Sequence, residues 1–317
     1  MINKVLRKLS NSLIKLVLPI LSKIFISLKV NRRVINFLSE KSYYANNISD
    51  FSNKISSLIK NEKLIALDVG AQGGFNSDNF FPEKYKHFFE PIMLEPIAGE
   101  LEKIKDNYKY VINKGLWSSK AKKKLYILDK RLGSSSFYEP DKSLFPVHKI
   151  KKKYYYEYDV TKTIEVDCDT LTNELERLNI NNLDYLKIDT QGSEFEILKG
   201  IGNYRPLLIR TEVHINSMYK NVPEWANVLS LFEKLNYIAI DLKSIGSHAT
   251  RIPVEADMIF IPNFKSEEGK NLIKNNEEKF ISILLIFGQI ELLKVIARYI
   301  GFANSDFINE IEDKFFF

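Results

Sequence analysis

Two stretches of the chain combine an apolar strand, an acidic residue and a tight turn ahead of a helix. The first runs over residues 64–74 and contains Asp68; the second runs over residues 186–200 and contains Asp189. In open α/β sheets, ligands bind outside the carboxyl ends of the strands. We therefore expect Asp68 and Asp189 to lie at the ligand-binding edge of one sheet.

The glycines that follow Asp68 narrow the class of ligand. Gly70, Gly73 and Gly74 let the backbone turn sharply and approach a bound molecule closely. The turn does not match the dinucleotide fingerprint G-x-G-x-x-G, and the chain contains no phosphate-binding G-x-x-x-x-G-K-[ST] motif. The sequence thus favours a cofactor without a pyrophosphate, whose ammonium Asp68 could bind directly or through water.

Glu95 ends the next apolar run, about one βα unit after the glycine turn. A carboxylate at this position holds the ribose hydroxyls in sheets of this type. The structural alternative is a strand-end glutamate that only caps a helix. Because Asp68 and the glycine turn precede Glu95 at the spacing expected of one βα unit, the ribose-binding interpretation is favoured.

Five segments carry these features in a fixed order, at residues 68–74, 94–96, 166–171, 186–200 and 211–213. Together they resemble the FkbM-type methyltransferases, over about residues 63–262. The resemblance implies a Rossmann-like class I methyltransferase fold that uses S-adenosylmethionine, typically to methylate hydroxyl groups of sugars, polyketides or related metabolites. Two details depart from the commonest pattern: Gly73 replaces a bulkier apolar residue, and Thr190-Gln191 replaces Val-Glu, which removes a carboxylate.

The resemblance also implies a cofactor site built from strand ends and the turns after them. Its members would be Asp68, Gly70, Ala71, Gly74, Glu95, Pro96, Leu116, Trp117, Asp189 and Gly192. Asp68 and its turn would shape the methionine end, Glu95 would take the ribose, and Asp189 would lie beside the transferred methyl group. Trp117 would either stack on the adenine or pack in the core.

Methyl transfer to a hydroxyl requires alignment of oxygen, methyl and sulfur, and removal of the hydroxyl proton. The catalytic candidates are Asp189, Glu212 and His214, and residues 212 and 214 share one face of a strand. His214 is the first choice because histidine titrates nearest neutral pH, although a strand-end histidine is often structural. No metal is assigned, since a sulfonium leaves without one; strand-end carboxylates could still supply oxygen ligands.

Two loops are candidates for binding the substrate. Residues 131–138 are rich in hydroxyls and aromatic rings, which suits a sugar, and they contain Ser134, Ser135 and Ser136. Residues 245–251 contribute His248, and His214 could also contact the acceptor. Either loop could equally be an ordinary surface turn; the resemblance favours the serine-rich one.

The chain of 317 residues is 45% hydrophobic and 27% charged, which is typical of a folded protein. Its one cysteine, Cys168, excludes an internal disulfide and fits a reducing, cytoplasmic location. We expect a basic amphipathic helical segment at 1–60, the methyltransferase domain at 61–264 and a helical extension at 265–317. The domain should hold a mostly parallel, doubly wound, seven-stranded sheet. Candidate strands are 64–69, 92–95, 108–113, 124–128, 163–168, 183–189, 207–214, 237–242 and 257–262.

The terminal segments suggest further partners. Residues 1–39 carry many basic and no acidic residues, which favours either peripheral contact with the inner membrane face or packing on the domain. Lys15 and Lys23 interrupt this segment too closely for a membrane span. Residues 279–298 are too apolar to stand alone, so the terminal helices could also form a homo-oligomer. No nucleic-acid partner is expected, because the aromatic residues of the basic run 149–158 point both ways.

The sequence therefore predicts an O-methyltransferase that acts on a hydroxyl of a sugar, glycan precursor or glycosylated metabolite. One alternative is a metal-dependent nucleotide-sugar glycosyltransferase, because Asp167 and Asp169 form a D-x-D motif. That alternative leaves the glycine turn unexplained. A second alternative is a non-catalytic membrane-surface module, against which the joint presence of Asp68, Glu95 and Asp189 argues.

Overall fold

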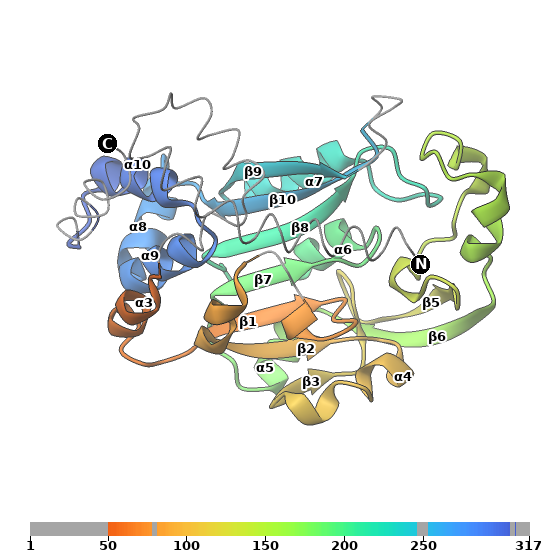
Figure 1. The fold of residues 1–317 in the computed structure, drawn as a ribbon, viewed down its shortest axis with the longest axis horizontal. Coiled ribbons are helices and arrows are strands. Elements are labelled where there is room, and N and C mark those ends of the chain that lie inside the picture. Colours follow the sequence, from red (N-terminus) through yellow and green to blue (C-terminus); the bar gives the residue numbers. More distant parts are fainter. Residues whose placement is uncertain (1–49, 78–80, 246–252, 305–307, 309–317) are drawn as a thin grey trace. The chain divides into compact units, whose positions relative to one another are not determined.

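The computed structural model describes residues 50–77, 81–245, 253–304 and 308 (Figure 1). They divide into two compact units. The sheet unit comprises residues 63–77 and 89–275, and the helical unit comprises the described residues of 50–62, 81–88 and 276–308. The predicted basic segment at 1–39 and the candidate His248 lie outside the described residues.

The sheet unit is built on one seven-stranded sheet with the strand order β3-β2-β1-β7-β8-β10-β9. The strands from β3 to β8 pair in parallel, whereas β10 runs antiparallel to both of its neighbours. The predicted mostly parallel, seven-stranded sheet is confirmed. The strands are β1 (Leu64–Val69), β2 (Phe89–Leu94), β3 (Tyr110–Ile112), β7 (Tyr185–Ile188), β8 (Leu208–His214), β9 (Tyr237–Ile245) and β10 (Glu255–Pro262).

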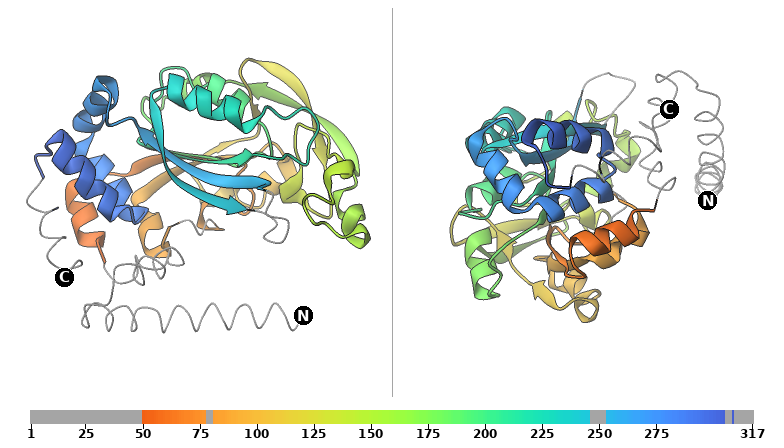
Figure 2. Two further views of the ribbon diagram at one scale, coloured as in Figure 1. Left: turned by 90° about the horizontal axis from the view of Figure 1, so that it is seen from above. Right: turned by 90° about the vertical axis from the view of Figure 1, so that its left-hand side faces the viewer.

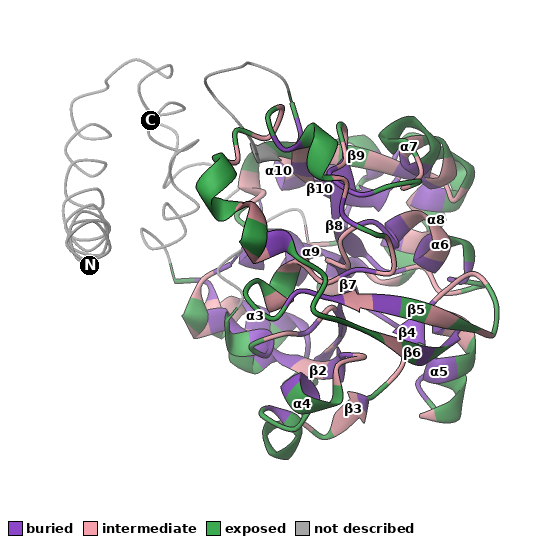
Figure 3. Cartoon of the chain, turned by 90° about the vertical axis from the view of Figure 1, so that its right-hand side faces the viewer, coloured by how far each residue is buried: buried purple, intermediate pink, exposed green. Residues whose placement is uncertain are grey.

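The central strands are apolar because both of their faces are covered. Every residue of β7 and β8 is buried, which matches the continuous apolar runs expected of a parallel sheet enclosed on two sides. Figure 3 shows the buried residues concentrated along these strands. Charged residues inside such strands, among them Lys187 and Glu212, are therefore exceptions that need a partner or a function.

Two of the predicted strands lie outside the main sheet. β5 (Ala121–Ile127) and β6 (Lys162–Asp169) pair antiparallel and, with the short β4 (Gly115–Leu116), form a separate three-stranded sheet. The first half of β5 alternates partly buried and exposed residues, as a strand with one solvated face does. The sequence marked β5 and β6 as strands, but it did not separate them from the parallel sheet.

Helices connect most strands of the sheet unit. The α-helices are α4 (Ala98–Leu101), α5 (Leu171–Arg177), α6 (Glu194–Lys199), α7 (Trp225–Lys234) and α8 (Glu267–Asn275). Short 3-10 helices are η2 (Phe75–Ser77), η4 (Lys105–Asn107), η5 (Leu132–Ser134), η6 (Lys142–Leu144) and η7 (Lys152–Tyr158). Helix α8 belongs to the sheet unit and contacts β10, although the sequence placed residues 265–317 in a separate extension.

The helical unit contains α3 (Ser52–Leu58), η3 (Glu83–Phe88), α9 (Glu277–Ile286) and α10 (Ile290–Ile300). The apolar segment predicted at 279–298 is two helices rather than one, and Gly288 between them adopts a left-handed φ of 71°. Helix α9 lies beside both α3 and α10 (Figure 2). No helix among the described residues is long and apolar enough to cross a membrane.

Strand order in the sheet reverses between β1 and β7. From β1 the chain adds β2 and β3 on one side, and later β7 and β8 on the other. A crevice at such a reversal is the usual ligand site of open α/β sheets. At this point the turn after β1 touches the end of β7: a Cβ placed on Gly70 would lie 1.9 Å from the carbonyl oxygen of Asp189. The φ of Gly70 is +81°. Only glycine allows both this left-handed backbone and the close contact with Asp189 without strain.

Substituting Gly70→Ala should lower the free energy of unfolding by roughly 2 to 4 kcal/mol, because the added methyl group forces the β1 turn away from β7. Urea unfolding of the purified chain measures this change.

The matched control is Gly99→Ala in α4, where an added Cβ meets nothing within 4 Å. That substitution should be neutral or stabilise the helix by a few tenths of a kcal/mol up to about 1 kcal/mol. Equal effects of the two substitutions would contradict the packing argument.

Candidate active site

Backbone hydrogen bonds join the carboxyl ends of three strands. The N–H groups of Gly70 and Ala71 both donate to the carbonyl oxygen of Leu94 at 3.1 Å, which ties the turn after β1 to the end of β2. The N–H of Asp189 donates to the carbonyl oxygen of Val69 at 3.0 Å, which ties the end of β7 to β1. The acidic residues predicted for this edge are thus brought together by the sheet itself.

Asp68 is buried and forms an ion pair with Lys187. The Nζ of Lys187 lies 2.9 Å from Oδ1 of Asp68, and the two residues face each other in the register of β1 and β7. Sequence reasoning missed Lys187, although a lysine inside an otherwise apolar strand was a signal of a buried partner. The ion pair fixes the Asp68 carboxylate directly before the glycine turn.

Glu95 is buried immediately after β2. Its Oε1 accepts a hydrogen bond from the N–H of Ile97 at 2.8 Å, at the start of α4. Burial and the neighbouring carboxylates of Glu100 and Asp68 together raise the pKa of Glu95 to about 7, against the lowering effects of the hydrogen bond from Ile97 and the Lys187 charge. One oxygen of the Glu95 carboxylate is therefore bound by the residue that precedes α4, and the group titrates near neutral pH.

The residues predicted near the adenine are packed into the second sheet. Leu116 is fully buried, and Trp117 is half-buried with its ring 5.9 Å from that of Phe137 and 6.1 Å from that of Tyr138, measured between centroids. The Lys123 ammonium lies 4.0 Å from the Trp117 ring centroid. Trp117 thus has packing partners of its own, which fits the core interpretation of this residue.

The turn after β7 is held in a left-handed conformation. Gln191, which is not a glycine, has a φ of 59°, and Gly192 follows with a φ of 118°. Glu194 accepts hydrogen bonds from the N–H groups of Thr190 and Gly192 and from the Thr190 hydroxyl. This carboxylate therefore stabilises the turn and the start of α6, and the strained Gln191 backbone is maintained by its surroundings.

The side chain of Gln191 links the turn to β8. Its Nε2 donates to Oε2 of Glu212 at 2.8 Å and, more weakly, to Oδ1 of Asp189 at 3.4 Å, while its Oε1 accepts from the Tyr219 hydroxyl at 3.0 Å. An amide can donate and accept at once, whereas a glutamate here would place a carboxylate against Glu212. The glutamine that replaces the commonest glutamate of the family at position 191 is therefore suited to its two neighbours, one a carboxylate and one a hydroxyl.

The serine-rich segment predicted to bind substrate holds the loops together. The Ser136 hydroxyl donates to the backbone oxygen of Gln191 at 2.7 Å and accepts from the N–H of Tyr138. The Ser135 hydroxyl accepts from the N–H of Leu128, and the carbonyl oxygen of Ser134 accepts from the Tyr219 hydroxyl. Ser135 and Ser136 thus use their hydroxyls, and Ser134 its backbone carbonyl, in hydrogen bonds within the chain, and their contact with a substrate stays a prediction.

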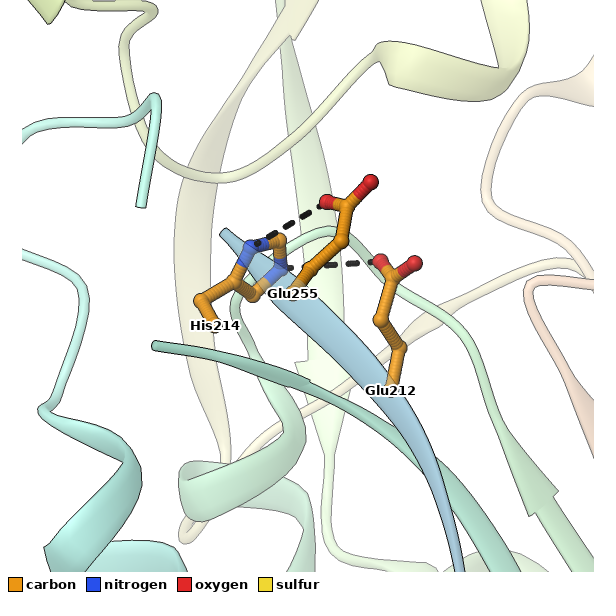
Figure 4. Close-up of side chains that lie close together, drawn as sticks. All are labelled: Glu212, His214 and Glu255. Atoms are coloured by element: carbon orange, nitrogen blue, oxygen red, sulfur yellow. Dashed lines mark ion pairs between the residues drawn. The ribbon is translucent and has the colours of Figure 1, made fainter. Parts of the chain in front are cut away.

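His214 lies between two carboxylates at the end of β8 (Figure 4). Its Nε2 is 3.7 Å from Glu212, and its Nδ1 is 3.8 Å from Glu255 of β10. Among the described residues, neither ring nitrogen has a hydrogen-bond partner, although His214 is only 4% exposed. We call Glu212, His214 and Glu255 the acid–histidine cluster.

Burial shapes the protonation of the acid–histidine cluster. It lowers the pKa of His214, and it raises the pKa of Glu212 well above its usual range, where the negative charge of Asp189 adds to the effect. Burial and the Asp189 charge also raise the pKa of Glu255 to about 7. The predicted candidates Glu212 and His214 are thus brought together, with a neutral imidazole that can accept a proton.

Glu255 was missed by sequence reasoning because β10 runs antiparallel. Its first residue, not its last, lies at the ligand-binding edge, opposite His214 in the β8 register. The signal available was the pair Glu255 and Asp257 with the spacing of one strand face. Asp257 lies opposite Glu212 and is 3.8 Å from Arg210.

The D-x-D motif does not form a common site. Asp167 is exposed on β6, near the ammonium of Lys122. Asp169 is buried, and its Oδ1 accepts from the N–H of Thr170 and from the Asn173 amide at the start of α5. The two carboxylates therefore serve a surface contact and a helix start.

The sheet order and the carboxylates at its edge define a Rossmann-like α/β enzyme fold with a site at the strand reversal. The model of the methyltransferase FkbM domain matches residues 68–239, and the chain belongs to this family, as the five segments predicted. The members of this family are methyltransferases, and the family generally uses S-adenosylmethionine.

One similar solved structure is the methyltransferase FkbM from Methylobacillus flagellatus KT, with 13% identity and a TM-score of 0.36. The match covers 63% of this chain and 43% of that protein, so it spans less than half of the longer molecule. No curated protein matches the chain.

The raised pKa of Glu95 predicts a pH-dependent stability. Glutamate in the unfolded chain ionises near pH 4.5, whereas folded Glu95 retains its proton to about 7. Between these values the unfolded state binds fewer protons, so this residue lowers stability as the pH rises. The variant Glu95→Gln should be more stable than the parent chain at pH 8, by roughly 1 to 3 kcal/mol.

At pH 5 the difference between the two proteins should be small, because Glu95 is largely protonated when folded. Urea unfolding at pH 5 and pH 8 compares them. A difference that does not change with pH would contradict the assigned burial effect.

Proposed function

We propose that this chain is an S-adenosylmethionine-dependent O-methyltransferase that acts on a hydroxyl of a sugar, glycan precursor or glycosylated metabolite. The observation that carries the proposal is the convergence of Asp68, Glu95 and Asp189 at three hydrogen-bonded strand ends, next to a histidine that can accept a proton. Membership of the FkbM family supports the reaction class.

The residues at the strand ends fit the cofactor. Gly70 and Gly74 have left-handed φ angles, and a Cβ on Gly74 would lie 2.8 Å from the Tyr108 hydroxyl, so the turn has no room for a side chain. Asp68 stands beside this turn for the methionine ammonium. Glu95 uses Oε1 for the N–H of Ile97, and within the described residues its Oε2 makes no hydrogen bond and is left for a ribose hydroxyl.

S-adenosylmethionine, when bound, supplies an electrophilic methyl group on a sulfonium. The chain's own residues then have to position the acceptor oxygen and take its proton. His214 suits this task, because burial lowers its pKa and keeps the imidazole neutral at physiological pH. The negative charges of Glu194 and of Asp189, at the end of β7, would stabilise the positive charge that develops on His214.

A hydroxyl-rich acceptor is also supported by a hollow of about 410 Å³ in the loops of the sheet unit. Most of the side chains that line it are polar, charged or aromatic. They include Glu139, Asp141, Ser143, Tyr158 and Lys220. Carboxylates, a hydroxyl, an ammonium and an aromatic ring can bind the many donors and acceptors of a sugar.

Calorimetry with S-adenosylmethionine tests the cofactor assignment. Both Glu95→Ala and Asp68→Asn should weaken binding by about 5- to 100-fold, since each removes a charged hydrogen-bond partner. The matched control Asp167→Asn, which removes an exposed carboxylate from β6, should leave the affinity unchanged.

Two results would overturn this assignment. One is unchanged affinity in both Glu95→Ala and Asp68→Asn. The other is a chain that binds a nucleotide sugar with Mn²⁺ but not S-adenosylmethionine, with that binding lost in Asp167→Asn, as expected for the glycosyltransferase alternative.

Transfer of a labelled methyl group to a panel of sugars and glycosylated metabolites tests the O-methylation. An ether product should survive treatment with alkali, whereas a methyl ester would release methanol. Label that alkali removes completely would contradict transfer to a hydroxyl.

A further inference from the structure

We propose that Glu212, His214 and Glu255 bind one divalent first-row transition-metal ion. The binding itself requires no assumption about the cofactor. Its consequence for the acceptor, given below, rests on the proposed methyl transfer.

The first argument is the geometry of the acid–histidine cluster. One ligand atom from each residue lies within 4.8 Å of the other two. Ligand atoms around a metal ion at about 2.0 to 2.2 Å stand roughly 3 to 3.5 Å apart. Movements of about 1 Å and a choice of one ring nitrogen therefore complete the coordination, with the strands β8 and β10 holding the three residues in place.

The second argument is that His214 lacks a partner. Buried polar atoms are nearly always hydrogen-bonded, yet both nitrogens of this ring are without a hydrogen bond and enclosed among acidic side chains. In the part of the chain that the structure describes, neither Glu212 nor Glu255 lies within 4 Å of a lysine or arginine. A cation bound by the cluster would give one of the two ring nitrogens a partner and neutralise the two carboxylates.

The third argument is that one ligand is already oriented by a neighbour. Gln191 donates to Oε2 of Glu212 and accepts from Tyr219, so the amide is fixed at both ends. Metal-binding carboxylates are typically held by such hydrogen bonds. Gln191 is neutral, whereas the glutamate common in the family would add a third carboxylate beside the cluster.

The ligand types indicate the class of metal. Carboxylates suit Mg²⁺, Ca²⁺ and Mn²⁺, whereas imidazole suits first-row transition metals, so a set of two carboxylates and one histidine favours ions such as Mn²⁺. Three protein ligands leave coordination positions open for a substrate oxygen. If the chain methylates a hydroxyl as proposed, the ion would bind that oxygen and lower the pKa of the hydroxyl. In that metal-bound form His214 is a ligand, so the hydroxyl proton would pass to Asp189, the catalytic candidate outside the cluster.

Titration of the metal-stripped, full-length chain with Mn²⁺, followed by electron paramagnetic resonance, tests the proposal. One Mn²⁺ per chain should bind, and pulsed spectra should show coupling to a histidine nitrogen. Glu255→Gln and His214→Asn should each weaken binding by about 10- to 100-fold or more, and His214→Asn should remove the nitrogen coupling.

The controls Glu165→Gln and His87→Asn remove an exposed residue of each type and should bind Mn²⁺ like the parent chain. Absence of a bound Mn²⁺, a bound ion without nitrogen coupling, or equal binding by all variants would overturn the proposal. Circular dichroism confirms that each variant is folded. Calorimetry with S-adenosylmethionine on the same samples separates the two claims, since cofactor binding without Mn²⁺ binding would refute the metal site alone.

Discussion

The close approach of the β1 turn to the end of β7 is the constraint on which the site depends. Gly70 has no side chain, so its backbone lies against the Asp189 carbonyl. One residue before that turn, the Asp68–Lys187 ion pair joins the same two strands inside the sheet. A buried ion pair adds little net stability, but it specifies which groups face each other. Here it sets the register that brings Asp68, Glu95 and Asp189 to one edge.

The other half of the site depends on Gln191. Its left-handed backbone, held by Glu194 and Ser136, directs the amide toward Glu212. Tyr219 closes the network on the far side of that amide. These hydrogen bonds connect the edge proposed for the cofactor with the acid–histidine cluster and fix the distance between them.

Much of the sheet was predictable from the sequence because its signals are local. The apolar runs at β1 and β7, each with an acidic residue at its end, identified the strands and brought their acidic residues to one edge of the sheet. Contacts between distant segments were not predictable. Lys187 pairs with a residue 119 positions away, and Glu255 reaches the site only because β10 runs antiparallel. The hydrogen bonds that join Ser134 and Ser136 to distant segments were not predictable either, since such bonds leave no local pattern.

Hydrogen–deuterium exchange with and without S-adenosylmethionine tests the central claim most directly, because amide protection maps a binding site onto the chain. We predict slower exchange at residues 69–75, 94–98 and 189–194 together, and no change in α9 and α10. Protection confined to β5 and β6, or no protection at any of the three strand ends, would contradict a single cofactor site at the reversal of the sheet.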